Sequence, residues 1–197
     1  MGQTSSMDAI ALLRNDHRAV ERLFKEFEKA GPRAHKTRRQ VADRIVKELS
    51  VHAVIEEQLF YPAVREAVPD ADDDVLEGLE EHHIVKWTLS EVDGMDPEHE
   101  RFVPKMTVLM ESVRHHVEEE EGELFPTVRE AMTRKQLTEL GDAMAQAKEI
   151  APTAPHPRAP DTPPAGATGP TASAVKKAAA AHKKAVAVKK KATSKRR

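Results

Sequence analysis

The chain has 197 residues and no cysteine, which excludes disulfide bonds and thiolate metal ligands. No stretch comes near the roughly 18 apolar residues of a membrane-spanning helix, and the first residues lack a secretory pattern, so we expect a cytoplasmic protein without membrane contact. The net charge of −2 conceals two opposite parts: residues 151–197 carry eleven Lys or Arg and one acid, which leaves 20 basic and 32 acidic side chains, a net of −12, in residues 1–150.

Apolar residues recur at helical spacing throughout the first 150 residues, and no stretch has a convincing strand pattern. We predict helices over about 8–30, 35–67, 72–93, 96–132 and 134–148. The acidic residues of "DADDD" (70–74) are expected to cap the third helix and to complement its dipole. Asp96-Pro97-Glu98 reads as the start of the fourth, with a cap followed by proline in the first turn. The short connections favour an all-α antiparallel four-helix bundle with a short fifth helix.

Composition changes after Ile150. Seven of the thirteen prolines lie between Pro152 and Pro170, and the residues that follow are mainly alanine and lysine. Such a segment cannot bury a core, so we divide the chain into a bundle, 1–150, and a disordered linker and basic tail, 151–197. Its clustered cations make DNA or another polyanion a candidate partner of residues 171–197. The alternatives are a solubilising tail and one that folds back on the acidic bundle.

One stretch of the bundle occurs twice. "HAVIEEQLFYPAVREAV", from His52, and "HVEEEEGELFPTVREAM", from His116, are identical at eight of 17 positions, among them a histidine, two glutamates and a proline. A plain helical repeat would preserve apolar positions and let polar ones drift. The histidine and the first glutamate of each copy, His52 with Glu56 and His116 with Glu120, fall on the apolar seam of their helix, where leucine is expected.

A buried carboxylate is costly unless it is paired or bound to a metal, and residues at i and i+4 can converge on one ion. A single HxxxE pair is better explained as a solvated face, but two copies on apolar seams favour metal. The other helices each place one histidine on a seam, His17 and His82. These are 65 residues apart, against 64 for His52 and His116, which indicates a duplicated helix pair. His83 is the rival of His82, on a poorer stripe.

Four imidazoles and two carboxylates are too many for one tetrahedral zinc and suit two octahedral ions that share bridging glutamates. We predict two iron ions with an oxo or hydroxo bridge, although donor type alone does not separate iron from manganese, cobalt or zinc. The predicted metal ligands are His17, His52, Glu56, His82, His116 and Glu120. Glu57 and Glu121 lie about 100° off the seams, so we expect a contact to a ligand residue or a solvated salt bridge for them.

Other notable residues are expected to be structural. Surface positions are predicted for His35, His99, His115, His156 and His182. Trp87 is expected to pack the third helix against a neighbour. Tyr61 is expected in the core, with a hydroxyl near the metal as the alternative. Pro62 and Pro126 each remove one helix hydrogen bond and are expected to bend their helices.

Four motifs, "RNDHRAV", "HAVIEEQLFYP", "EEHHIVKW" and "HHVEEEEGELFP", together resemble the hemerythrin family and in particular its bacterial HHE cation-binding branch. The resemblance covers residues 8–132 and implies a four-helix bundle whose non-haem di-iron centre binds or senses dioxygen, nitric oxide or peroxide. Oxygen-carrying hemerythrins of marine worms use five His, one Glu and one Asp, so four His and two Glu argue against reversible oxygen transport. One alternative is a di-iron enzyme that decomposes peroxide or oxidises ferrous iron, although no seam position offers a spare general acid. The other is a nucleoid-associated protein acting through its tail.

Overall fold

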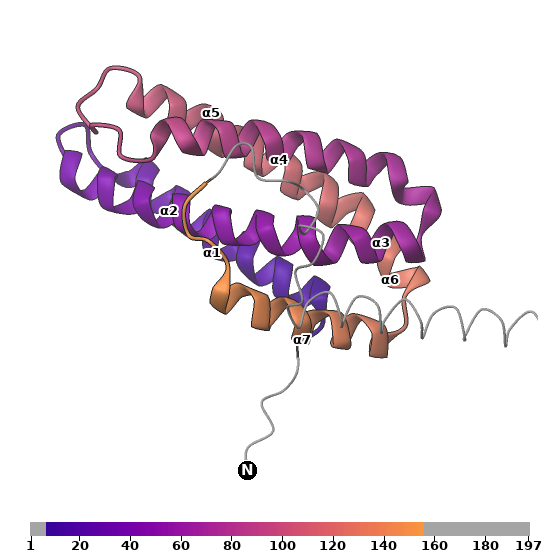
Figure 1. Cartoon of the computed structure of the whole chain (residues 1–197). Coiled ribbons are helices and arrows are strands. Elements are labelled where there is room, and N and C mark those ends of the chain that lie inside the picture. Colours follow the sequence, from indigo (N-terminus) through magenta and orange to yellow (C-terminus); the bar gives the residue numbers. More distant parts are fainter. Residues whose placement is uncertain (1–6, 156–197) are drawn as a thin grey trace, which may run out of the picture.

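A computed structural model describes residues 7–155, which fold into a helical bundle without a β-strand among them (Figure 1). The elements are α1 (Ala9–Lys29), α2 (His35–Ile55), η1 (Glu56–Phe60), α3 (Tyr61–Ala67), η2 (Pro69–Ala71), α4 (Asp72–Val92), α5 (Phe102–Glu119), η3 (Glu120–Leu124), α6 (Phe125–Ala131) and α7 (Arg134–Ile150). The predicted all-α bundle with a fifth helix is confirmed. The predicted tail from residue 156 onward, with His156 and His182, lies outside the described residues. Within 7–155, no helix has the length and apolar character needed to cross a membrane.

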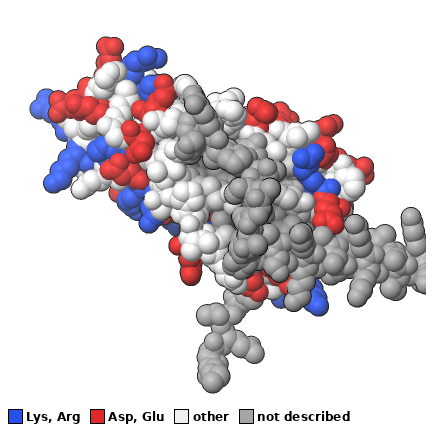
Figure 2. All heavy atoms as spheres, in the orientation of Figure 1, with Lys and Arg blue, Asp and Glu red and all other residues white. Residues whose placement is uncertain are grey.

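Four long rods make up the bundle, as Figure 1 shows. The first is α1, the second is α2 continued by η1 and α3, the third is α4, and the fourth is α5 continued by η3 and α6. α1 lies along α2 and α4 lies along α5, as expected when short loops join antiparallel neighbours. α7 packs against α1 and α2. Figure 2 shows Lys and Arg interspersed with Asp and Glu at the end that carries the α1–α2 and α4–α5 connections.

The second and fourth rods each contain a π-helical turn directly before a proline. The Tyr61 amide donates to the Glu56 carbonyl, and the Phe125 amide donates to the Glu120 carbonyl, both five residues back. Pro62 follows the first of these turns, and the second is followed by the other repeated proline. The wider turn therefore accommodates a residue without an amide hydrogen, and it begins at the repeated glutamate in both copies. Such turns are frequent at functional sites.

Two helix starts differ from prediction. The fourth rod begins at Phe102, because the Asp96 carboxylate instead accepts from the Glu98 amide in a turn before the helix. Pro104 then occupies the first helical turn, where a missing amide hydrogen costs little. At α4 the predicted cap is also wrong: the capping position is Ala71, without a side-chain hydrogen bond, although three aspartates do place negative charge in the first turn.

Trp87 does not pack α4 against a neighbour, contrary to prediction. Trp87 is 56% exposed, and nearby Ile84 is 62% exposed. The buried stripe of α4 instead runs through Val85 and Leu89, on either side of Trp87 in sequence. Trp87 points outward because it is two residues, about 200°, from each of them and so lies on the opposite side of the helical wheel.

The apolar core is divided in two. One cluster joins α7 to the adjacent ends of the rods and includes Leu13 and Met144, and the other fills the far end and includes Phe24 and Met106. On α1, His17 lies between the two clusters in sequence and is buried. The same holds on the other three rods, so a layer of buried polar side chains crosses the middle of the bundle.

Candidate metal centre

The structure brings all six predicted ligand residues into this polar layer, each at most 6% exposed. Every long rod contributes, and the two glutamates stand at the first position of the two π turns. The residues are His17 from α1, His52 from α2, Glu56 from η1, His82 from α4, His116 from α5 and Glu120 from η3. The rival His83 is exposed, because it lies on the outer side of α4.

Donor atoms of these residues form two neighbouring groups that share one carboxylate. Within each group, all donor atoms lie within 4.8 Å of one another. The first group is His17, His52, Glu56 and Glu120, and the second is Glu56, His82 and His116. Two adjacent positions at which a cation meets three or four nitrogen and oxygen donors are therefore present, with Glu56 common to both.

The histidines turn their Nε2 atoms toward the two inner carboxylates. Glu56 Oε2 lies 2.9 Å from His52 Nε2 and 3.4 Å from His82 Nε2. The His82 and His116 Nε2 atoms are 3.1 Å apart, a distance too short for two protonated nitrogens. One of the two must therefore present a lone pair, as a metal-ligating imidazole does.

Glu120 repeats this arrangement in the other half of the site. Its Oε2 lies 3.3 Å from His17 Nε2 and 3.6 Å from His116 Nε2. Each inner carboxylate thus faces one histidine from a HxxxE rod and one from a lone-histidine rod. The duplicated helix pair produces an approximate two-fold relation within the centre.

An outer carboxylate faces the Nδ1 atom of every one of the four histidines. Such partners hold a metal-ligating imidazole in one orientation and direct its other nitrogen to the ion. The pairs are His17 with Glu121 at 2.9 Å, His52 with Asp16 at 3.7 Å, His82 with Glu57 at 3.1 Å, and His116 with Glu81 at 2.6 Å. Buried Lys86 forms an ion pair with one of these outer carboxylates, with its Nζ 2.8 Å from Glu57 Oε1.

Sequence reasoning missed two of these outer carboxylates, Asp16 and Glu81. Both directly precede a lone seam histidine, and they are 65 residues apart, the same offset that relates those histidines. Applying the duplication to the acidic neighbours as well as to the histidines would have found them. Glu57 and Glu121, for which a ligand contact or a solvated salt bridge was expected, both contact a histidine. Glu121 also lies 3.6 Å from Arg14.

The inner and outer carboxylates raise the proton affinity of two histidines. Burial alone would lower the pKa of His52, but attraction to the negative charges of Glu56 and Asp16 outweighs burial and raises the pKa to about 10. Burial also opposes protonation of His116, yet the surrounding glutamates, Glu120 foremost, raise its pKa to about 9. A cation that binds here releases these protons, because an imidazole ligand is neutral at the coordinating nitrogen.

Buried oxygen atoms in the layer remain without hydrogen-bond partners. They are both carboxylate oxygens of Glu56 and the Oε2 atom of Glu120. The nearby imidazole nitrogens are close enough for ion pairs but do not have hydrogen-bond geometry toward these oxygens. An unpartnered buried carboxylate is strongly destabilising, and cation binding compensates for it. The donor set, with four imidazoles and two carboxylates, fits iron or a similar transition-metal ion.

Tyr61 adds a hydroxyl group to the centre. It is 1% exposed, and its hydroxyl donates to Glu120 Oε1 at 3.0 Å, so both the core position and the alternative near the metal site apply. Burial first, and then the charges of Glu120 and Glu56, raise the pKa of Tyr61 well above its ordinary value of 10. The corresponding residue in the other repeat is Phe125, which stacks on His17 instead. Neither oxygen of Glu56 therefore accepts a hydrogen bond, whereas Glu120 accepts one through Oε1.

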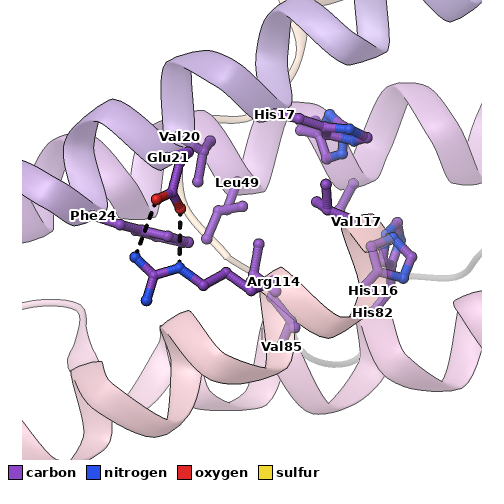
Figure 3. Close-up of a pocket in the computed structure, with 13 residues that line it drawn as sticks. His17, Val20, Glu21, Phe24, Leu49, His82, Val85, Arg114, His116 and Val117 are labelled. Carbon is purple, nitrogen blue, oxygen red and sulfur yellow. Dashed lines mark hydrogen bonds and ion pairs between the residues drawn. The ribbon is translucent and has the colours of Figure 1, made fainter. Parts of the chain in front are cut away.

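A cavity of about 120 Å³ lies against the four histidines. Its other walls are mostly apolar, among them Val20, Phe24, Leu49, Val85, Val113 and Val117. Figure 3 shows Arg114 and Glu21 on the side of the cavity away from the histidines, joined by an ion pair of 3.0 Å. Because most of the exposed wall surface is apolar, the cavity admits small apolar molecules more readily than ions.

Comparison with known proteins assigns most of the bundle to one family. The family model for the hemerythrin HHE cation-binding domain matches residues 8–128. An uncharacterized hemerythrin-like protein of Schizosaccharomyces pombe is 29% identical over 150 residues, which cover 76% of this chain and 73% of that protein. A DNA nickase of Nostoc is 27% identical over 137 residues, which cover 70% of this chain but 38% of that protein. The crystal structure of a hemerythrin HHE cation-binding domain-containing protein from Mycobacterium kansasii has a TM-score of 0.62 at 25% identity, and covers 73% of this chain and 86% of that one.

Proposed function

The chain belongs to the hemerythrin HHE cation-binding family, and we propose that it holds two iron ions at the buried centre and binds dioxygen or nitric oxide there. The family establishes a cation-binding domain. The identity of the cation, the number of two and the gaseous ligand are proposed from the site. The proposed iron ligands are His17, His52, Glu56, His82, His116 and Glu120.

The two donor groups that share Glu56 support a count of two ions, because a common carboxylate is how paired metal sites hold their ions a few ångströms apart. Iron bound there would supply the electron exchange and the open coordination position that a small oxidant requires. The protein itself fixes the donors: each imidazole is held by its outer carboxylate, and Tyr61 holds Glu120. Two apolar clusters shield the layer from water at its two ends along the bundle.

The observation that carries the proposed ligand is the apolar cavity against the histidines. Dioxygen and nitric oxide are small and neutral, and they lose little hydration on entering such a space. Peroxide would lose several hydrogen bonds to water with few polar groups to replace them. The cavity therefore favours the two gases over peroxide.

Decomposition of peroxide is a second candidate, favoured by the Tyr61 hydroxyl. The sequence offered no spare general acid on the seams, whereas this phenol is a buried proton donor at the centre. Its raised pKa keeps it protonated at neutral pH.

We expect the iron-loaded protein to contain two iron ions per chain and its reduced form to change its visible spectrum when dioxygen or nitric oxide is added. Metal analysis and anaerobic spectroscopy measure both. Saturation at one ion per chain would contradict the paired centre, and a spectrum unaffected by either gas would contradict the ligand. Sustained turnover of hydrogen peroxide would favour the enzyme.

Deleting residues 151–197 should leave iron content and helicity unchanged, because none of the proposed ligands lies there. The deletion should remove affinity for DNA, since the segment carries a net charge of +10 against −12 for the remainder. In the full chain that affinity should fall steeply with salt, with a logarithmic slope of up to roughly −9 if ten phosphates are neutralised. Binding of the full chain, the truncated chain and a tail peptide to duplex DNA at two salt concentrations measures this. If the chain truncated after residue 150 still binds DNA, the assignment of DNA binding to residues 151–197 is contradicted.

A further inference from the structure

A third group of metal-capable side chains lies at the surface, outside the centre described above. Glu81 on α4 and His115 and Glu119 on α5 each place a donor atom within 4.8 Å of the others. His115 Nε2 lies 3.3 Å from Glu119 Oε1 and 4.0 Å from Glu81 Oε1. His115 is exposed, as predicted for a surface histidine, and both glutamates are half-buried. The group is thus accessible to a cation in solution.

Glu81 belongs to the surface group and also contacts the buried centre. Its Oε2 lies 2.6 Å from His116 Nδ1, while its Oε1 faces His115. A cation held at the surface group is therefore separated from the centre by a single carboxylate and the His116 ring.

An acidic pocket of about 60 Å³ runs beside these residues to the centre. Its inner wall includes Glu120, a buried residue with an unpartnered Oε2 atom. Gly78 leaves space there: a Cβ at that position would lie 3.0 Å from the Tyr61 hydroxyl and 3.5 Å from His116 Cε1. The carboxylates that line the pocket are Asp74, Glu77, Glu81, Glu119, Glu120 and Glu123. The volume suffices for several waters or a partly hydrated ion.

Two of the pockets that reach the centre, the apolar cavity and the acidic pocket, have opposite chemistry. His116 is the one residue that lines both of them. A cation entering the apolar cavity would lose its hydration without replacement, which is prohibitive. In the acidic pocket, carboxylates replace the lost water and their combined field attracts cations.

We propose that Glu81, His115 and Glu119 form a capture site for a divalent cation such as ferrous iron, which then enters the centre along the acidic pocket. The inference rests on the proposed metal centre and adds its route of loading. The surface group supplies one nitrogen and two carboxylate donors, a set that binds ferrous iron without the enclosure of the buried centre. Weak binding there permits transfer inward.

The test is the rate at which metal-free full-length protein takes up ferrous iron without oxygen, followed by competition with a coloured chelator. The double variant His115→Ala/Glu119→Gln should load about tenfold more slowly at low ionic strength, because the captured cation and part of the attractive field are lost. Its final iron content should equal that of the wild type. Glu111→Gln is the matched control: it removes one charge from an exposed position of the same helix outside the acidic pocket, so its rate should be unchanged.

Each of the other possible outcomes contradicts either the capture site or the proposed metal centre. Loading of the double variant at the wild-type rate, with full iron content in both, overturns the capture site and leaves the proposed function standing. Reduced final iron content in the variant overturns it as well, because the residues would then belong to the centre. Wild-type protein that takes up no iron overturns the proposed function and the capture site together.

Discussion

Glu56→Ala is expected to abolish binding of both iron ions. Glu56 is the one residue common to the two donor groups, and both of its oxygens lack hydrogen-bond partners. Its removal leaves the second group with two imidazoles only and also takes one donor from the first. Metal analysis after loading with excess iron should therefore find well below one ion per chain. Two retained ions would contradict the shared role of Glu56.

Matched variants distinguish loss of a metal ligand from a non-specific loss of stability. His82→Ala removes a donor from the second group only, so we expect about one ion to remain. His83→Ala is the control, because the neighbouring imidazole is exposed and should leave both ions bound. Loss of iron in His83→Ala with retention in His82→Ala would contradict the phase assigned to α4.

The six proposed ligands could be predicted because each occupies a leucine position of a regular apolar seam. That regularity fixes which side of the helix faces inward, and it favours His82 over His83 without knowledge of how the helices pack. The predicted resemblance to the hemerythrin family is confirmed by the family match. The ligand roles and the division of the chain at residue 150 stay predictions.

Two of the four outer carboxylates could not be predicted from single helices. Asp16 and Glu81 lie one residue off the seam, and whether such a side chain reaches a histidine depends on how two rods pack together. No local pattern encodes that distance.

The contact between the Tyr61 hydroxyl and the centre was hard to predict for a different reason. In a regular helix, five residues turn through about 500°, which places Tyr61 about 140° away from Glu56. The π turn, with its i to i+5 hydrogen bonds, brings the two back toward the same face. Helical periodicity therefore fails at the point where the repeated proline widens the turn.

Removing the metal should lower the unfolding temperature of the protein by about 8–16 °C. An ion present at 1,000 times its dissociation constant contributes about 4 kcal/mol, and for a domain of this size each kcal/mol shifts the unfolding temperature by about 2–4 °C. The physical reason is that both oxygens of Glu56 and the Oε2 atom of Glu120 are buried without a hydrogen-bond partner among the described residues. Calorimetry before and after chelation measures the difference. Equal unfolding temperatures would show that the centre holds no tightly bound cation.

The double variant His52→Leu/Glu56→Leu should abolish this dependence of stability on metal. It restores leucine to two seam positions and removes a buried ion pair of 2.9 Å as a unit, so neither partner is left uncompensated. Replacing such a pair by apolar residues is neutral or stabilises by about 1–4 kcal/mol. We therefore expect the variant to be at least as stable as the metal-free wild type, and added iron should not stabilise it further. A variant less stable than the metal-free wild type would mean that the pair supports the fold by itself, and the case for metal from polar residues at leucine positions would fail.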